Sequence, residues 1–234
     1  MTVTARFNVT DVNLASFDLY RDIHKGIRAD LFAVTSEAGN VDPHDWDGAV
    51  DLAAHVGRTV ELLASHAEHE DRAVLPAIEE HLPALAVRIS TDHASLETRM
   101  ETLNALAGAV VETPGERRRR PVQWLYLELA SFTGTYLAHQ DVEERAVMPA
   151  LERALGLDAV LGIHHEIVSN IPPDEMAKTL ALMLPAMNVD DRVELLAGLR
   201  ATAPAPVFEG VFGLAASVLT PADHAAVAAG LGIA

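Results

Sequence analysis

Two stretches of the chain, HAEHEDRAVLPAIEE (66–80) and HQDVEERAVMPALER (139–153), carry the same pattern. Each begins with a histidine, has a glutamate four residues later, and has a proline six residues after that glutamate. Four residues turn an α-helix through about 400°, so the histidine and the glutamate of each copy stand on one face. Each copy can therefore direct two donor groups at one point.

The apolar residues around these stretches recur at steps of three and four, which predicts long amphipathic helices. We expect four of them, over residues 13–38, 43–80, 83–111 and 121–155. Glycine and proline between these ranges end the helices and turn the chain. Such a pattern predicts an all-α protein whose core is an up-down-up-down four-helix bundle.

Pro76 and Pro149 stand at equivalent places in the two copies. A proline inside a helical pattern lacks the amide donor and crowds the preceding turn, so it kinks or closes the helix. We therefore expect the second and fourth helices to be kinked or to end near these prolines.

The other two helices each carry one histidine, His24 in IHKGIRADL and His93 in DHASLETRM. In an up-down-up-down bundle, the starts of the first and third helices and the ends of the second and fourth share one end. At 1.5 Å per residue, His24, Glu70, His93 and Glu143 each lie roughly 15 to 18 Å from that end. The sequence therefore predicts one layer of donor groups across the bundle.

Four buried histidines and two buried carboxylates are costly unless they are paired or hold a metal. Six ligands exceed the need of one tetrahedral zinc ion, whereas two ions that share the carboxylates fit the count. The chain has no cysteine, so the ligands must be nitrogen and oxygen. Such donors suit iron, manganese or zinc. The predicted metal ligands are His24, His66, Glu70, His93, His139 and Glu143.

This set, together with LPAIE and MPALE after the paired motifs, resembles the hemerythrin-like, HHE cation-binding family over roughly residues 14 to 155. The resemblance implies a four-helix bundle around a non-haem centre of two iron ions with bridging carboxylates and an oxo or hydroxo bridge. Manganese and zinc are the alternatives. Oxygen-carrying members place a second histidine on the third helix, where this chain has Glu97. This departure favours redox turnover or iron-linked sensing over reversible oxygen carriage.

Four neighbouring residues have roles that the pattern leaves open. Tyr20 and Tyr136 lie one turn or three residues before a predicted ligand, and each either packs in the core or hydrogen-bonds a group at the metal site. Glu97 and His69 are alternative ligands, which the repeat does not favour. The arginine run at 117–120 is expected to lie in a solvated loop without a ligand.

We expect a division of the chain into a bundle, 1–155, and a C-terminal α-helical extension, 156–234. In the extension, three or four short helices from about residue 172 are predicted. Thr220, Pro221 and Asp223 have the pattern of a helix start, with Thr220 as the N-cap.

The composition of the chain argues against two classes of binding partner. The formal net charge is -17, which argues against nucleic acid and against an anionic membrane surface. Without an apolar leader or a long apolar run, a cytoplasmic protein is expected. The predicted partner is a small oxidant or gas, namely hydrogen peroxide, O2 or NO, and the oligomeric state is left open.

Three functions therefore compete. The chain is a peroxide-decomposing enzyme, a protein that reversibly binds O2 or NO or reports on iron, or a module that the metal stabilises for interaction with a partner.

Overall fold

The computed structural model describes residues 15–233, and every regular element among them is helical. The prediction of an all-α protein is therefore confirmed. The long helices are α1 (Arg21–Asn40), α2 (Trp46–Ala73), α4 (Pro83–Glu112) and α5 (Arg119–Val142). The shorter elements are α3 (Leu75–His81), a 3-10 turn η2 (Gly115–Arg118), a π-helical turn η3 (Glu143–Val147), α6 (Met148–Leu155), α7 (Leu157–Asn170), α8 (Pro173–Ala186), α9 (Val189–Thr202), α10 (Ala205–Val218) and α11 (Pro221–Gly230).

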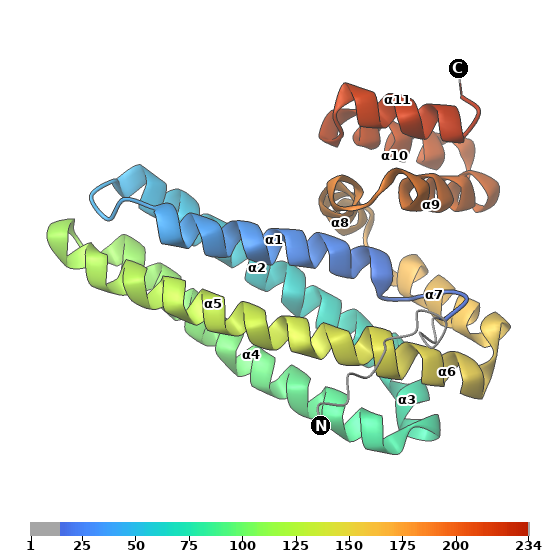
Figure 1. The fold of residues 1–234 in the computed structure, drawn as a ribbon, viewed down its shortest axis with the longest axis horizontal. Helices are drawn as coiled ribbons and strands as arrows, with labels where there is room; N and C mark the ends of the chain where they lie inside the picture. The colour runs from blue at the N-terminus through green and yellow to red at the C-terminus, as the bar shows by residue number, and fades with distance from the viewer. Residues whose placement is uncertain (1–14, 234) are drawn as a thin grey trace, which may run out of the picture.

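The four long helices lie side by side (Figure 1). α1 packs against α2 and α5, and α4 packs against the same two helices, so the four surround one core. Its residues follow the three- and four-residue spacing of the sequence, as Ile27, Leu31 and Val34 of α1 do. All three are fully buried. Burial of each such side chain contributes about 1.5 to 3 kcal/mol.

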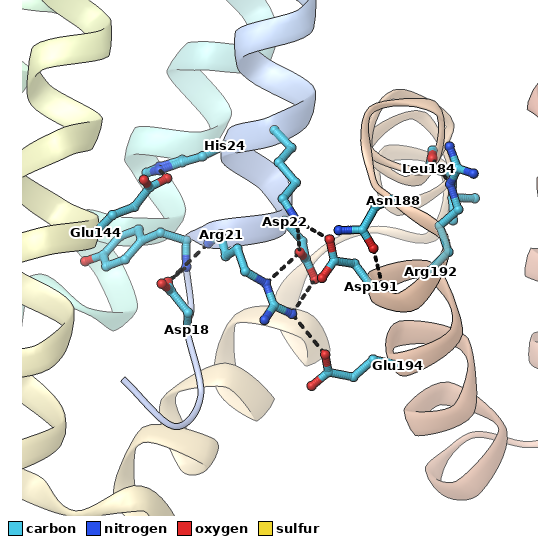
Figure 2. Close-up of polar contacts among 12 residues, drawn as sticks. Asp18, Arg21, Asp22, His24, Glu144, Leu184, Asn188, Asp191, Arg192 and Glu194 are labelled. Atoms are coloured by element: carbon cyan, nitrogen blue, oxygen red, sulfur yellow. Dashed lines mark hydrogen bonds and ion pairs between the residues drawn. The ribbon is translucent and has the colours of Figure 1, made fainter. Parts of the chain in front are cut away.

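The first helix begins at Arg21, eight residues later than the sequence predicted, and the part of that range before residue 15 lies outside the described residues. The reason is Asp18, whose carboxylate accepts hydrogen bonds from the backbone N–H groups of Tyr20 and Arg21 (Figure 2). A side chain that accepts bonds from the first free amides marks the start of a helix. Asp18 therefore fixes the turn that leads into His24.

The second and fourth predicted helices are each divided near their proline. α2 ends at Ala73, only Val74 separates it from α3, and Pro76 occupies the first turn of α3. α5 passes into the π-helical turn η3, and Pro149 occupies the first turn of α6. Because proline cannot donate to the preceding turn, the hydrogen-bond ladder is interrupted at both places. The predicted effect of the two prolines is confirmed.

The chain beyond the bundle forms five helices. α7 packs on α2 and α6. Its Val160 belongs to a second apolar cluster, separate from the core described above, which also contains Tyr20 and Met148. α8 to α11 have a core of their own, built around Leu184, Leu196 and other apolar residues. The division of the chain after residue 155 stays a prediction.

The helices α8 to α11 begin at regular intervals of 16 residues, counted from Pro173 to Pro221. Thr220 caps the last of them, because its hydroxyl accepts a hydrogen bond from the N–H of Asp223, as predicted. The regular spacing makes these helices similar units that pack on one another.

The helices α8 and α9 of the extension lie against α1 (Figure 2). A Cβ atom on Gly26 would lie 3.3 Å from Leu182 and from the backbone of Met183, so glycine lets α8 approach closely. Around this contact, Lys25 pairs with Asp191 of α9. Arg21 pairs with Glu194 at 3.2 Å and with Asp22 on its own helix.

In the arginine run, Arg117, Arg119 and Arg120 are exposed as expected, but the prediction is wrong for Arg118. Its side chain is 4% exposed and its guanidinium donates to the carbonyl oxygens of Val110 and Pro43. It therefore ties the connection before α5 to the bundle instead of lying in a solvated loop. No helix within residues 15–233 is both long enough and apolar enough to cross a membrane.

Candidate metal centre

The six residues predicted as metal ligands come together in the bundle. They form two groups, and within each group the donor atoms all lie within 4.8 Å of one another. The two groups share one glutamate, so they form a single cluster. The first group is Glu70, His93, His139 and Glu143, and the second is His24, His66 and Glu70.

The four long helices and the π-helical turn supply these side chains. α2 contributes His66 and Glu70 one turn apart, and α5 ends three residues after His139. Glu143 is the first residue of η3. π-helical turns are uncommon and occur frequently at functional sites. Here the turn begins at a residue of the cluster.

Glu70 faces two histidines with its two carboxylate oxygens. Oε1 lies 3.1 Å from Nε2 of His66, and Oε2 lies 3.5 Å from Nε2 of His93. These histidines belong to different groups of the cluster, since His66 stands with His24 and His93 stands with His139. The Glu70 carboxylate therefore spans the two halves.

Glu143, the equivalent of Glu70 in the second copy of the repeat, spans the same two halves. Its Oε1 lies 3.1 Å from Nε2 of His139, and its Oε2 lies 3.5 Å from Nε2 of His24. His24 and His66 are themselves close, with 3.3 Å between their Nε2 atoms. Two carboxylates thus lie between two pairs of imidazoles.

Several donor atoms of the cluster are buried without a hydrogen-bond partner. They are both carboxylate oxygens of Glu70, Oε2 of Glu143, Nε2 of His93 and Nδ1 of His139. Glu70 is 6% exposed and Glu143 is 1% exposed, so bulk water has little access to hydrogen-bond these carboxylates. A buried polar atom that lacks a partner is costly, and a cation would remove that cost. The nitrogen and oxygen donors fit iron, manganese or zinc.

The carboxylates and histidines of the cluster stabilise each other's charged forms. Burial acts to raise the pKa of Glu70, but the positive charge of the adjacent His66 outweighs it and holds that pKa well below its usual range. Burial acts to lower the pKa of His93, but the neighbouring carboxylates of Glu143, Glu70 and Asp71 raise it to about 11. The carboxylates are therefore ionised, and protons sit where a cation would otherwise balance them.

Carboxylates outside the cluster orient two of its histidines. The Nδ1–H of His24 donates to Glu144 at 2.9 Å (Figure 2). The Nδ1–H of His93 donates to Asp71 at 2.7 Å. With one proton held on Nδ1, the Nε2 atom of each ring faces the cluster and would bind a metal after losing any proton of its own, as in metal sites whose histidines are oriented by outer carboxylates.

Sequence reasoning missed these outer carboxylates, although the repeat contains a signal for them. Asp71 directly follows Glu70, and Glu144 directly follows Glu143. An acidic residue at the same position of both copies indicates a shared role. Asp92 lies near the remaining imidazole, with its Oδ2 3.6 Å from Nδ1 of His139, which is too long for a hydrogen bond.

The two tyrosines lie against histidines of the cluster. The ring of Tyr20 stacks on His24 with 5.4 Å between centroids, and the ring of Tyr136 meets His139 edge-on at 5.9 Å. Burial, followed by repulsion from Glu143 and Glu70, raises the pKa of both phenols well above the usual value. Both tyrosines therefore keep their protons.

The two alternative ligands lie outside the cluster. Glu97 is exposed on α4. His69 points toward the extension, with its Nε2 3.8 Å from Oε1 of Glu175 on α8. Glu175 also accepts a hydrogen bond from Ser65, so α8 covers the turn of α2 that carries His66.

The chain was compared with known proteins. The model of the hemerythrin HHE cation binding domain matches residues 15–151. No curated protein and no solved structure matches the chain. The matched range contains all six clustered residues and more than half of the chain. The chain therefore belongs to the hemerythrin HHE cation-binding domain family.

Proposed function

We propose that this chain is a non-haem protein with two iron ions that acts on small oxidants or gases, with hydrogen peroxide as the leading substrate. One observation carries the proposal. The buried carboxylates of Glu70 and Glu143 each turn one oxygen toward one imidazole pair and the other oxygen toward the second pair. This is the arrangement that two neighbouring cations with bridging carboxylates require.

We further infer that α1, α2, α4 and α5 run in alternating directions as an up-down-up-down bundle. The convergence of His24, Glu70, His93 and Glu143 supports this inference, because that topology brings these four positions to one depth. Iron is proposed because histidine and carboxylate suit it and because of the family to which the chain belongs. Manganese and zinc remain outcomes of the metal analysis.

The residues of this chain would do three things. Glu70 and Glu143 supply negative charge, and Glu144 and Asp71 keep the Nδ1 protons of His24 and His93 in place. The buried surroundings limit the access of bulk water. Bound iron would supply redox chemistry by moving between its ferrous and ferric states. In peroxide decomposition, one molecule is reduced to water while a second is oxidised to O2.

The experiment that tests the metal proposal is metal analysis combined with an ultraviolet-visible spectrum. We expect about two irons per chain and charge-transfer absorption. Glu70→Ala and Glu143→Ala should lose more metal than His24→Ala, because a bridging carboxylate serves both ions. Glu97→Ala is the matched control, since this exposed carboxylate should be dispensable. One metal per chain, or equal metal retention in all variants, would refute a bridged pair.

A second experiment separates an enzyme from a reversible binder. The protein is reduced without air, O2 is admitted and the spectrum is followed, and O2 release from peroxide is then measured beside an iron-free control. We expect oxidation without a long-lived O2 adduct, together with peroxide turnover. A stable adduct that is reversed by removing O2, without turnover, would support the reversible binder. Metal-dependent stability with neither reaction would support the interaction module.

A further inference from the structure

Gln140 is a buried polar residue that the proposed centre does not use. It directly follows His139 on α5, its side chain is fully buried, and neither its Oε1 nor its Nε2 has a hydrogen-bond partner. An amide that loses water without gaining a partner destabilises the fold by about 1 to 3 kcal/mol. Such a cost suggests a use for the amide.

Most buried side-chain atoms without a hydrogen-bond partner belong to Gln140 or to the metal centre. Across residues 15–233 there are eight such side-chain atoms, five of which belong to Glu70, His93, His139 and Glu143. Two belong to Gln140, and the last belongs to His224 on α11. Apart from His224, unpaired groups therefore occur at the metal centre and at the residue beside it.

Helix geometry places Gln140 between α5 and α1. It lies seven residues after Thr133 on α5 and four before Glu144, the second residue of η3, so the three lie along one side of this helical stretch. Thr133 bonds to Thr35 of α1, and Glu144 bonds to His24 of α1. Gln140 therefore faces the stretch of α1 between these two contacts, where the buried residues Ile27, Leu31 and Val34 are aliphatic and Arg28 is paired with Glu144.

Gln140 is also next to the centre along α5. Glu143 follows it by three residues, which corresponds to about 4.5 Å along the axis and about 60° around it. Tyr136, one turn earlier, lies against His139. Gln140 thus lies between His139 and Glu143 along the chain, at the level of the centre, and Tyr136 lies one turn farther toward the middle of the bundle.

We propose that the Gln140 amide hydrogen-bonds the small molecule that the centre takes up. The inference rests on the proposed function and adds a chemical preference to it. An amide donates and accepts, which suits a molecule that also does both, such as hydrogen peroxide, better than an apolar gas. Gln140 would then orient the bound molecule and raise its affinity.

The test uses azide, a small anion that accepts hydrogen bonds, on the full-length iron-loaded protein. Gln140→Met keeps the length of the side chain and removes the amide, and Gln140→Leu is the second variant. At an equal iron-to-protein ratio, we expect the azide dissociation constant to rise about tenfold, the equivalent of about 1.4 kcal/mol for one hydrogen bond. The thermal midpoint of the metal-free variants should stay level or rise, because an unpaired amide has been removed.

Thr133→Val is the matched control, because it removes another buried polar group from the same face of α5. It should change the thermal midpoint and leave azide affinity unchanged. Unchanged affinity in both Gln140 variants would overturn the inference, as would loss of iron in both of them. If the wild-type protein takes up no iron and gives no azide band, the proposed function fails and this inference fails with it.

Discussion

Replacing Glu144 by glutamine tests whether the carboxylate behind His24 strengthens the metal site. In the structure one oxygen, Oε1, accepts from Nδ1 of His24 at 2.9 Å and from Arg28 at 2.8 Å. Glutamine keeps an acceptor but loses the charge. A hydrogen bond to a charged group contributes about 1.5 to 3 kcal/mol, against about 0.5 to 1.5 for a neutral one. The difference of about 1 kcal/mol or more predicts an affinity for iron that is roughly tenfold lower, within the range known for outer partners of metal ligands.

The measurement is competition with a chelator for ferrous iron, without air, followed by the spectrum of the chelate. Arg28→Gln removes the other partner of Glu144 but keeps the bond to His24, so it should retain nearly wild-type affinity. Asp141→Asn is a second control, because Asp141 pairs with Arg145 on the surface, where ion pairs contribute little. If Arg28→Gln weakened iron binding as much as Glu144→Gln, Glu144 would act through the helix contact and not through His24.

Three further predictions follow from the contacts and charges described above. Gly57→Ala should stabilise the protein by about 0.5 to 1 kcal/mol, because the added Cβ meets open space. Gly26→Ala should stabilise it less, because the added Cβ would press on α8. Equal increases in the thermal midpoint would contradict the close packing of α8. The pKa of His93 is raised to about 11 in the metal-free protein, so its stabilising effect is complete below about pH 6.5 and is lost as the pH rises toward 11. Urea unfolding of the metal-free protein should therefore show falling stability from pH 7 to pH 10, and a flat profile would contradict the charge balance of the cluster. Tyr20→Phe and Tyr136→Phe should each slow O2 release from peroxide while iron content stays unchanged; a full rate in both variants would reduce the tyrosines to packing residues.

The residues that meet at the centre could be found in the sequence because the signal is local and repeated. His66 and Glu70 share a helix face at four-residue spacing, and the same spacing recurs at His139 and Glu143. Helix rise then gave a common depth for His24 and the other single histidine, and the structure brings all six together. Their roles as ligands stay predictions.

Contacts between distant parts of the chain could not be predicted in this way. The close approach of α8 to Gly26 depends on the surfaces of two elements that are far apart in the sequence. Arg118 can be buried because carbonyl groups of two other segments accept hydrogen bonds from its guanidinium. A run of arginines has the same appearance in sequence whether it is solvated or bonded in this manner.

The sequence by itself determined which helices form and which side chains share a helix face, because both follow from periods of three and four residues within one segment. The tertiary structure alone decided which oxygen of Glu70 faces which histidine and that Gln140 is buried without a partner. These features depend on the rotation and spacing of neighbouring helices, which arise when the whole core packs. A helical period fixes the face of a residue, whereas packing fixes what that face meets.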